Sequence, residues 1–468
     1  MKKNITYLFV FLLTLSSCKF GPNYTRPNMT TPASFRYEEV KTDSVLNLKW
    51  WELFQDEQLN TLINSALKNN QNILIAAARI EEARAALGYN KADMYPSFGY
   101  NVNASRTNLT GNQKGDAYNS FFIAPNLNWE IDFWGKYRRS TEAARAELLA
   151  SQYAQRAVQI GLISEVASAY FLLLDYESRL EISRNTLTSR RESLRIISER
   201  FDKGTVAEID LNQAEIQEAI AAASVPLYER LVAQTENSLS ILLGLNPSPI
   251  MKKSPLIEQV LPPDIPAGIP SEILDRRPDV LQTEQMLAAQ NARIGVAQAM
   301  RLPSISLTGF LGAASPELNT LFTDDGMVWS MGGSLLGPVF NFGKNKRRVE
   351  IERQRMVQDS LLYVQTVLQA FREVDDALIE VSTYKDEVGA RVRQRDAAKN
   401  ANTLSQERYN GGVTSYLEVL DSERSLFEAK LSASETYQLQ LNAYVKLYKA
   451  LGGGWLSKEE EAGENSSQ

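Results

Sequence analysis

The chain of 468 residues contains no histidine and only one cysteine. Histidine is the commonest general base and the commonest zinc ligand in proteins, so its absence argues against an enzyme and against a metal site. A single cysteine excludes an intrachain disulfide and a paired-cysteine redox motif. The net charge of −6 offers no excess of Lys and Arg for nucleic acid. We therefore predict no catalytic site, no metal, no cofactor and no nucleic-acid partner.

The N-terminus carries a short apolar run and not the long one that a membrane-spanning helix would need. The 11-residue stretch ITYLFVFLLTL follows Lys2 and Lys3 and precedes small residues. This layout is typical of a secretory signal peptide, whereas a spanning helix needs about 20 apolar residues. We assign residues 1–17 to a signal peptide.

The lone cysteine, Cys18, stands at the end of LSSC, which resembles the bacterial lipobox. The resemblance implies cleavage before Cys18 and the addition of an S-diacylglycerol and an N-acyl lipid to it. Each lipid methylene buried in a membrane contributes about 0.8 kcal/mol to such an anchor. An ordinary signal peptide with an incidental cysteine is the alternative. Lys19 replaces the aspartate that would retain such a lipoprotein in the inner membrane, which permits an outer-membrane destination.

Two parts of the chain resemble each other. RFDKGTVAEIDLNQAE from Arg200 and RYNGGVTSYLEVLDSE from Arg408 both place an aromatic residue after the arginine and a glycine four residues after it. The offset of 208 residues also relates FWGKYRR to NFGKNKR, while Pro96 and Pro303 lie 207 residues apart. Several landmarks in one order indicate an internal duplication.

The duplication divides the chain into five segments. Eight of the 17 prolines lie in residues 246–278, which predicts a linker because proline interrupts helices and central strands. The acidic, polar C-terminus predicts a disordered tail. The segments are the signal peptide 1–17, the first repeat 18–245, the linker 246–278, the second repeat 279–456 and the tail 457–468.

Each repeat contains a region typical of very long helices. Residues 135–203 and 343–411 are rich in Ala, Leu, Glu and Arg, contain no proline and end at glycine. A helix of this length spans about 100 Å. Residues 206–243 and 413–451 predict second helices that return antiparallel to the first, so each repeat forms a helical hairpin.

Strand patterns precede each hairpin. SFGYNVNAS from Ser97 and FFIAPNLNWEIDF from Phe121 alternate apolar and polar residues, which is the period of a strand with two different faces. SISLTG near Ser304 and VWSMGGSLLGPVF near Val328 repeat this pattern more weakly. We predict four strands in the chain.

Two architectures fit such strands. One is a soluble sandwich, and the other is an outer-membrane β-barrel, which the lipid anchor favours. Four strands cannot close a barrel, because even the smaller barrels use about eight, so several copies of the chain would have to close it. In a barrel, Glu130 and Asp132 on the polar face of the second strand line the channel.

Four segments, with the lipobox and the duplicated hairpins, identify the chain as a member of the TolC-like outer membrane factors. They are CKFGPNYTRP from Cys18, WWELFQDEQLNTLINSAL from Trp50, DRRPDVLQTEQMLAAQNARIGVAQA from Asp275 and RYNGGVTSYLEVLDSERSLFEA from Arg408. The chain most resembles the branch of outer membrane efflux lipoproteins related to OprM and NodT-type proteins. The resemblance implies an α+β membrane protein, in which three protomers contribute four strands each to a 12-stranded transmembrane β-barrel and long antiparallel hairpins to a periplasmic α-barrel.

The resemblance also implies a function. The homotrimer would be a passive conduit in the bacterial outer membrane, in contact with its lipid, extending into the periplasm. It would dock onto a periplasmic adaptor protein and would be driven by an inner-membrane pump of the RND type to export drugs and other toxic small molecules. The duct of a type I protein secretion system or of a metal-ion efflux system is the alternative within transport.

Two other classes of protein fit the sequence less well. An adaptor protein would have one hairpin and a lipoyl-like β domain, which the duplication opposes. An enzyme would have to rely on Asp/Glu pairs, and these lie on expected helix faces without a surrounding constellation.

The resemblance assigns adaptor docking to the turns at the hairpin tips, and simple helix capping is the alternative. The docking residues are Gly204, Thr205, Val206, Gly412, Val413 and Thr414.

The resemblance places an aperture near the same tips. Glu418 and Asp421 share a helix face and match the acidic residues that ring the closed aperture, with a solvated surface as the alternative. Asp210 and Tyr409 match positions that hydrogen-bond across the aperture to hold it shut. Ser415 stands where this lock has an arginine, so that part of the lock departs from the family pattern.

Overall fold

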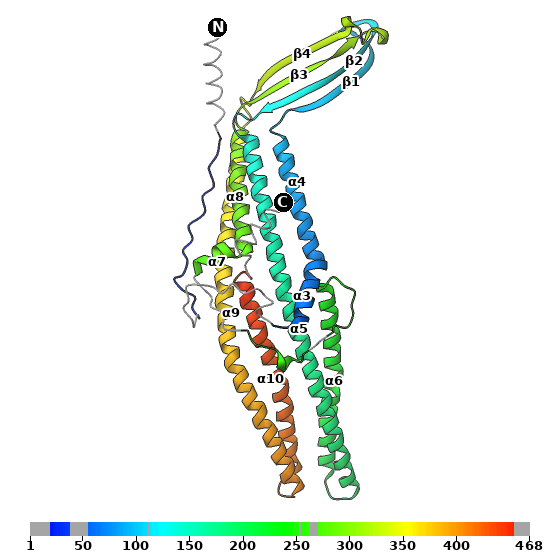
Figure 1. The fold of residues 1–468 in the computed structure, drawn as a ribbon, viewed down its shortest axis with the longest axis vertical. Helices are drawn as coiled ribbons and strands as arrows, with labels where there is room; N and C mark the ends of the chain where they lie inside the picture. Colours follow the sequence, from blue (N-terminus) through cyan, green and yellow to red (C-terminus); the bar gives the residue numbers. More distant parts are fainter. Residues whose placement is uncertain (1–18, 38–54, 111–112, 252–253, 263–269, 454–468) are drawn as a thin grey trace. The chain divides into compact units, whose positions relative to one another are not determined.

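The computed structural model describes residues 19–37, 55–110, 113–251, 254–262 and 270–453 (Figure 1). The predicted signal peptide, Cys18, Trp50 and the acidic tail lie outside these residues. In chain order the elements are α3 (Glu57–Asn69), α4 (Gln71–Ala92), β1 (Ser97–Thr110), β2 (Gln113–Ile131), α5 (Lys136–Asp202), α6 (Glu208–Leu242), η1 (Leu256–Glu258), α7 (Pro270–Arg276), α8 (Pro278–Ala299), β3 (Ser304–Ser315), η2 (Leu318–Thr320), η3 (Asp324–Gly326), β4 (Met327–Leu336), α9 (Lys344–Asn410) and α10 (Tyr416–Ala450).

The internal duplication is visible in the bounds of the elements. α9 and α10 begin and end 208 residues after α5 and α6, and α8 begins and ends 207 residues after α4. The offset changes by one residue between the start of β3 and the start of α9. From α4 and α8 onward the two copies therefore differ in length only around the strands, where β3 and β4 have 12 and 10 residues against 14 and 19 in β1 and β2.

The four predicted hairpin helices lie within one residue of their predicted bounds except at two starts, and α3, α4, α7 and α8 were not predicted. α5 and α9 are one residue shorter at each end than the predicted ranges. α6 and α10 begin at Glu208 and Tyr416, later than the predicted residues 206 and 413, because the residues before them form the reverse turns. The proline-rich linker also contains α7, which begins at Pro270. Proline suits the first position of a helix, where its missing N–H would have no partner.

The four strands form one antiparallel sheet in the order β1-β2-β3-β4. One row across the sheet consists of Phe98, Leu127, Gly309 and Met331, which are register partners in turn. The two neighbouring rows carry Asn, Ser, Thr and Gly, with Phe310 as the exception, so one face of the sheet is apolar and the other is largely polar. The strands β1 and β4 are its two edges.

The apolar face of the sheet is exposed. The exposed fraction reaches 84% at Tyr100 and 82% at Met331. In a soluble sandwich these apolar side chains would have to be buried against a second sheet, whereas in a membrane they could stay in contact with lipid. The exposed apolar side chains on this face are Phe98, Tyr100, Val102, Leu311, Met327, Trp329, Met331 and Leu335.

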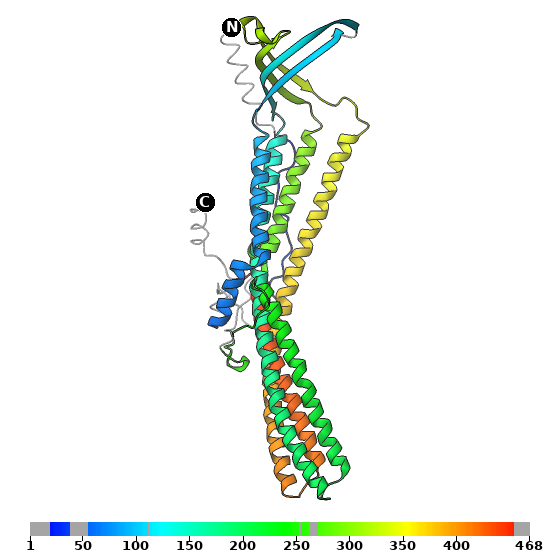
Figure 2. The same cartoon turned by 90° about the vertical axis from the view of Figure 1, so that its right-hand side faces the viewer.

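The chain divides into two compact units, and each contains parts of both repeats. Of the described residues, the first unit comprises those within 19–28, 78–152 and 282–365, and it holds the sheet. In it, α4, α5, α8 and α9 follow one another side by side (Figure 2). Three junctions join them: Ser140 donates to Asn90 across α4 and α5 at 2.5 Å, Arg293 of α8 pairs with Glu147 of α5, and the Gln290 side chain of α8 donates to Glu352 of α9 at 2.7 Å.

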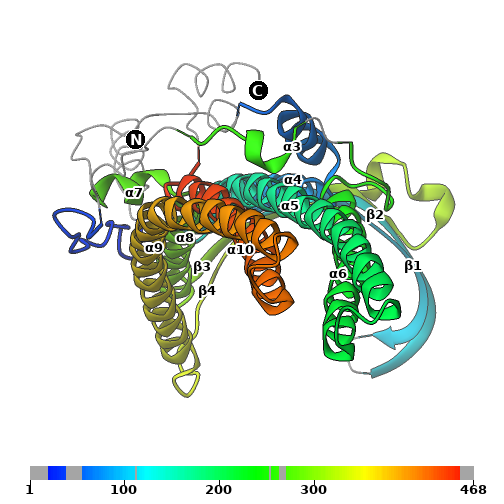
Figure 3. The ribbon, with the colours of Figure 1, turned by 90° about the horizontal axis from the view of Figure 1, so that it is seen from below.

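The second unit holds the two helical hairpins. α5 pairs with α6 and α9 pairs with α10 (Figures 1 and 3). Its main core is built from α3, α5, α6, α10 and the linker, and Tyr170 and Leu239 are fully buried there. Asp56 caps α3 by accepting from the amides of the next turn, and it also accepts from the Tyr170 hydroxyl at 2.9 Å and from the Gln259 amide at 3.0 Å.

One described helix, α5, contains a stretch apolar enough to cross a membrane by length and composition, with a mean hydropathy of 1.7. Half of that stretch is buried inside the protein. The helix supplies much of the main core, including Val166 and Leu173, so core packing accounts for its apolar composition.

Candidate functional site at the hairpin tips

Both hairpins reverse direction through the same glycine-based motif. Gly204 and Gly412 have φ angles of +75° and +68°, which side-chain-bearing residues rarely adopt. The amide of Thr205 donates to the Arg200 carbonyl at 2.9 Å, and the amide of Gly204 donates to the Phe201 carbonyl at 2.7 Å. The same two bonds close the second tip, so both are Schellman motifs. Capping therefore explains both glycines, whatever else the tips do.

The side chains after the two glycines are unequally exposed. Val413 is 72% exposed, whereas Val206 packs against the core of the tips. The Thr205 hydroxyl donates to the carbonyl of Arg200 at 2.8 Å, and the Thr414 hydroxyl donates to Glu418. Docking of a partner at these turns stays a prediction, and Val413 is the apolar side chain most available for it.

A small core unites the tips of both hairpins. It draws residues from α5, α6, α9, α10 and the first turn, so the two hairpins pack together at their ends. Its members are Ile197, Ala214, Tyr416, Val419 and Leu420, with Leu194, Val206, Leu211 and Tyr409 packed against them.

The predicted lock residues Tyr409 and Asp210 are both near this core but are not bonded to each other in the part of the chain that the structure describes. The ring of Tyr409 lies 5.4 Å from that of Tyr416, and the guanidinium of Arg200 lies 5.2 Å from its centre. Burial raises the pKa of Tyr416, and the negative charges of Glu423 and Asp210 add to this rise. A bond of Asp210 or Tyr409 across an aperture stays a prediction.

The two predicted aperture carboxylates each have a basic partner on their own chain. Glu418 lies 3.6 Å from the Arg408 guanidinium and also accepts from Thr414. Asp421 pairs with Arg424 at 2.6 Å. These ion pairs are exposed, so each contributes about 0–1 kcal/mol and leaves the carboxylates available to other cations. The acidic ring stays a prediction, with its charge partly compensated.

Glu130 and Asp132, the predicted channel-lining residues, are held by the first turn of α5. Glu130 accepts from the Lys136 ammonium at 2.7 Å and from the Tyr137 hydroxyl at 2.9 Å. Asp132 accepts from the amides of Tyr137 and Arg138 at 3.0 and 2.9 Å. Asp132 was expected inside the strand, but β2 ends one residue before it and its carboxylate caps the helix instead. Basic neighbours thus offset both charges, while lining of a channel stays a prediction.

Two buried charged residues near the tips, Arg190 and Glu423, were not predicted from the sequence. Arg190 of α5 is 2% exposed, donates to the Gln217 carbonyl at 2.8 Å and lies 5.1 Å from the ring centre of Phe427. Glu423 of α10 is buried, and one of its oxygens accepts from Gln406 at 3.3 Å. Burial raises the pKa of Glu423. Glu423 occupies an apolar stripe position between Val419 and Phe427, and that spacing could have revealed it.

A second buried group links α5 to α10 farther from the tips. Asp175 is fully buried, accepts from the Ser434 hydroxyl at 2.6 Å and pairs with Arg179 at 2.8 Å. Arg179 also lies 3.4 Å from Glu435. Ser434 stands 208 residues after Pro226, which lies inside α6, so the second copy carries a hydrogen-bond donor where the first carries a proline.

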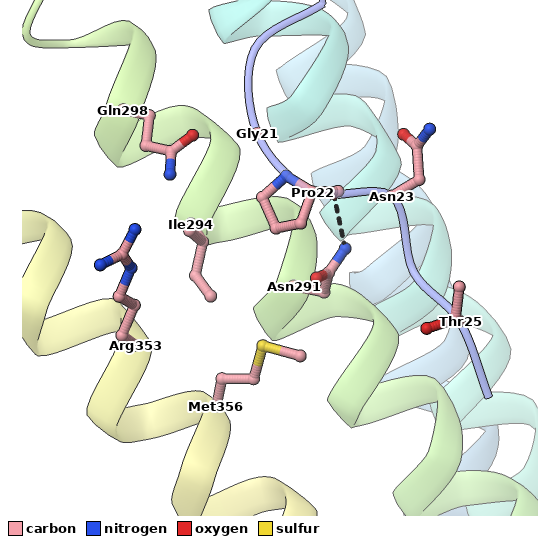
Figure 4. A pocket seen from close by; sticks show the side chains of 9 residues that line it. All are labelled: Gly21, Pro22, Asn23, Thr25, Asn291, Ile294, Gln298, Arg353 and Met356. Carbon is pink, nitrogen blue, oxygen red and sulfur yellow. Dashed lines mark hydrogen bonds between the residues drawn. The ribbon is translucent and has the colours of Figure 1, made fainter. Parts of the chain in front are cut away.

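The chain directly after Cys18 lies across the helices of the first unit. We call residues 19–26 the N-terminal strap. Figure 4 shows the strap crossing α8, where the Asn291 side chain donates to the Pro22 carbonyl at 2.9 Å. A pocket between the strap, α8 and α9 is lined in part by Ile294 and Met356. Arg139 of α5 anchors the strap by donating to the Phe20 and Gly21 carbonyls at 3.0 and 2.8 Å.

No group of three or more Cys, Asp or Glu side chains suited to a metal ion occurs among the residues that the structure describes.

Comparison with known proteins places these features in context. A family profile described as outer membrane efflux protein matches residues 62–245 and 269–453. The chain is 35% identical over 458 residues to the solvent efflux pump outer membrane protein SrpC of Pseudomonas putida, covering 95% of this chain and 97% of that protein. It is also 35% identical over 456 residues to the cation efflux system protein CusC of Escherichia coli, covering 96% of this chain and 98% of that one.

Solved structures show the same fold. The Campylobacter jejuni CmeC outer membrane channel matches with a TM-score of 0.88 at 27% identity, covering 96% of this chain and 98% of that one. A crystal structure of CusC matches with a TM-score of 0.85 at 32% identity, covering 93% of this chain and all of that one.

Proposed function

Because the chain belongs to the outer membrane efflux protein family, we propose that three copies of it form the passive outer-membrane conduit of a tripartite efflux system. The single observation that carries this is the sheet of four strands, which has an exposed apolar face and two unpaired edges. Open strand edges are not tolerated in lipid, so strands from other copies must close the sheet. Three copies would supply about 12 strands, a number within the range of known barrels.

The proposed partners follow from the same architecture. The tips of the hairpins, with the exposed Val413, supply a small apolar surface at the end of two packed helical pairs. A helical adaptor protein is the proposed partner at this end, and it would connect the conduit to an inner-membrane pump of the RND type. The chain offers no catalytic constellation at the tips, so the energy for export would come from the pump.

Small toxic molecules are the proposed cargo, and metal ions are the second candidate. The relative SrpC is named for solvent efflux, which supports the first, and CusC is named for cation efflux at the same identity, which supports the second. The pump would choose between them, because the conduit is passive.

Deletion of the gene tests the function and the cargo together. We expect the mutant to become sensitive to solvents and drugs, with no loss of enzyme activity, and a plasmid copy to restore resistance. Sensitivity to metal salts alone would favour the metal alternative. The purified chain should have the mass of a trimer in mild detergent, and a monomer there would contradict the barrel.

We also propose that Cys18 carries the lipid anchor implied by its lipobox. The strap that follows Cys18 is bound firmly through Arg139, so a lipid there would be tied to the first unit by a short ordered segment. Because the barrel inserts independently, Cys18→Ala with a cleavable leader should leave trimers in the outer membrane and retain efflux. Complete loss of efflux at normal trimer levels would contradict this, and the intact mass of the wild-type chain reports the lipid itself.

A further inference from the structure

The duplication makes α4 and α8 of the first unit equivalent, but the two helices have different surroundings. α8 lies between α5 and α9 and is buried on nearly all sides, whereas α4 is at one end of the row (Figure 2). Ala292 of α8 is fully buried, but Ala85, the equivalent residue of α4, is exposed. α9 is at the other end of the row. One protomer therefore contains one complete junction of this kind, between α5 and α8. It also carries the two helices that correspond to them, α9 and α4, at opposite ends of the row.

The complete junction is built around a glycine. A Cβ atom on Gly295 of α8 would lie 2.9 Å from the Arg139 Cγ and Cδ atoms and 2.8 Å from the Phe20 carbonyl oxygen. Real Cβ atoms do not approach other atoms that closely, so only glycine fits between α5 and the strap. Arg139 is 1% exposed here, and it pairs with Glu142 at 3.0 Å.

The glycine, arginine and glutamate of this junction recur at the equivalent positions of α4 and α9. Gly88 of α4 is the equivalent of Gly295, and Arg347 and Glu350 of α9 are the equivalents of Arg139 and Glu142. Arg347 pairs with Glu350 at 2.6 Å, as in the first copy. Yet nothing in the described chain lies within 4 Å of a Cβ atom on Gly88, and the Arg347 side chain is 76% exposed. Glycine weakens a helix relative to alanine, so an uncovered glycine here requires another explanation.

Close to Arg347, α9 exposes an apolar side chain at a position that is buried in α5. Ile351 is half-exposed, whereas its equivalent Ala143 in α5 is buried. Val357 and Leu361 extend the exposed apolar surface along α9. A charged or polar surface would be expected if this side of α9 faced only water.

We propose that Gly88 of one copy receives the side chain of Arg347 from a second copy, so that α4 and α9 form between protomers the junction that α8 and α5 form within one. The inference rests on the proposed trimer and names one of its contacts. The strap covers Arg139 in the first junction, and the described residues contain no second strap. The junction between copies therefore closes by direct contact of Arg347 with the α4 helix, and the glycine leaves room for it.

Cysteine cross-linking tests the contact in the full-length chain. Gly88→Cys combined with Arg347→Cys brings two thiols to the distance of a disulfide, roughly 4 Å between Cβ atoms. Under mild oxidation we expect covalent dimers and trimers on non-reducing gels. The single variants Gly88→Cys and Arg347→Cys must remain monomeric on the same gels, which also controls for Cys18. A reductant must return the double variant to monomers.

The failure of this inference can be told apart from failure of the proposed function. If the double variant yields only monomers on the gel while native mass shows a trimer, the Gly88–Arg347 contact is wrong and the conduit stands. If the unmodified protein is a monomer in detergent, the conduit itself is wrong.

A steric pair of variants decides the matter if the cysteine variants do not assemble. Gly88→Leu should fill the space for Arg347 and lower the association constant of the trimer about tenfold, since overpacking a closed contact is destabilising. Arg79→Leu is the matched control on the same helix, because Met286, the residue equivalent to Arg79, is exposed in the complete junction. Equal trimer stability of the two variants would overturn the proposal.

Discussion

At the scale of single residues, the most informative position is Glu423, a buried carboxyl group among the four helices at the tips. One of its oxygens accepts from Gln406, and the other has no hydrogen-bond partner in the described part of the chain. Burial raises its pKa above the ordinary value of 4.5, and the nearby Arg190 opposes that rise without cancelling it. The folded state therefore holds a proton at Glu423 more firmly than the unfolded chain does.

This linkage predicts how stability depends on pH. A raised folded-state pKa means that the stability associated with the group is present below pH 4.5 and is lost as pH rises through the folded-state pKa. Glu423→Gln should therefore stabilise the tips at pH 7 by on the order of 1 kcal/mol, and the gain should vanish in acid. Thermal melts of the trimer from pH 4 to 8 measure it. Glu428→Gln, an exposed change on the same helix, should show no such trend.

Two arginines at equivalent positions of the duplicated chain have different environments. Arg139 and Arg347 occupy equivalent positions and keep equivalent glutamate partners, yet one is buried beneath the strap and the other is exposed. The residues and their spacing are the same in both copies. Only the neighbours supplied by the rest of the fold differ.

At the scale of elements, α6 and α10 end where a glycine and its local backbone hydrogen bonds terminate the helix. Gly244 and Gly452 end α6 and α10 with positive φ angles of +71° and +93°, and they lie 208 residues apart like the tip glycines. Each is followed by an amide that bonds back to the carbonyl five residues earlier. This Schellman geometry depends on sequence-local groups, which is why the helix ends could be predicted from glycines alone.

The link between hairpins depends on a contact between elements. Ser434→Ala removes the hydroxyl that donates to the buried Asp175, and we expect a loss of about 1–3 kcal/mol in stability. The effect should appear as a lower melting temperature of the trimer without a change in its mass. Ser238→Ala, at an exposed hydroxyl of α6, is the matched control. A melting temperature equal to that of the control would show that Asp175 does not need this donor.

At the scale of the whole molecule, the predicted acidic ring would set the electrical behaviour of the conduit. Glu418 is half-exposed, Asp421 is exposed, and both are only weakly held by their own arginines, so three copies would still present carboxylates to passing cations. Replacing both with glutamine and asparagine should weaken block by multivalent cations in planar bilayers several-fold. Replacing Glu428 and Glu435 with glutamine leaves the block unchanged if the site is specific. Undiminished block in the first variant would contradict the assignment.

The family and the outer-membrane efflux function could be predicted from the sequence, and the comparisons confirm both. The motifs, the alternating strands and the duplication are all local patterns or repeated ones, and they survive without knowledge of distant contacts. The four strands were placed correctly, although β1 and β2 extend farther toward their turn than the alternation suggested. Asp132 was misplaced because a strand face and a helix cap both present a carboxylate at the end of an alternating run.

The sequence by itself determined where the four hairpin helices end, which strand residues face together, and that the chain is a duplicated unit, whereas α3, α4, α7 and α8 were not predicted. These follow from backbone geometry and periodicity, which act between residues close in the chain. The tertiary structure alone decided which equivalent residues are buried, because burial depends on segments hundreds of residues apart. Gly295 is enclosed by Arg139 and the strap, while Gly88 in the same pattern is open, and it is this difference in packing that points to a second copy of the chain.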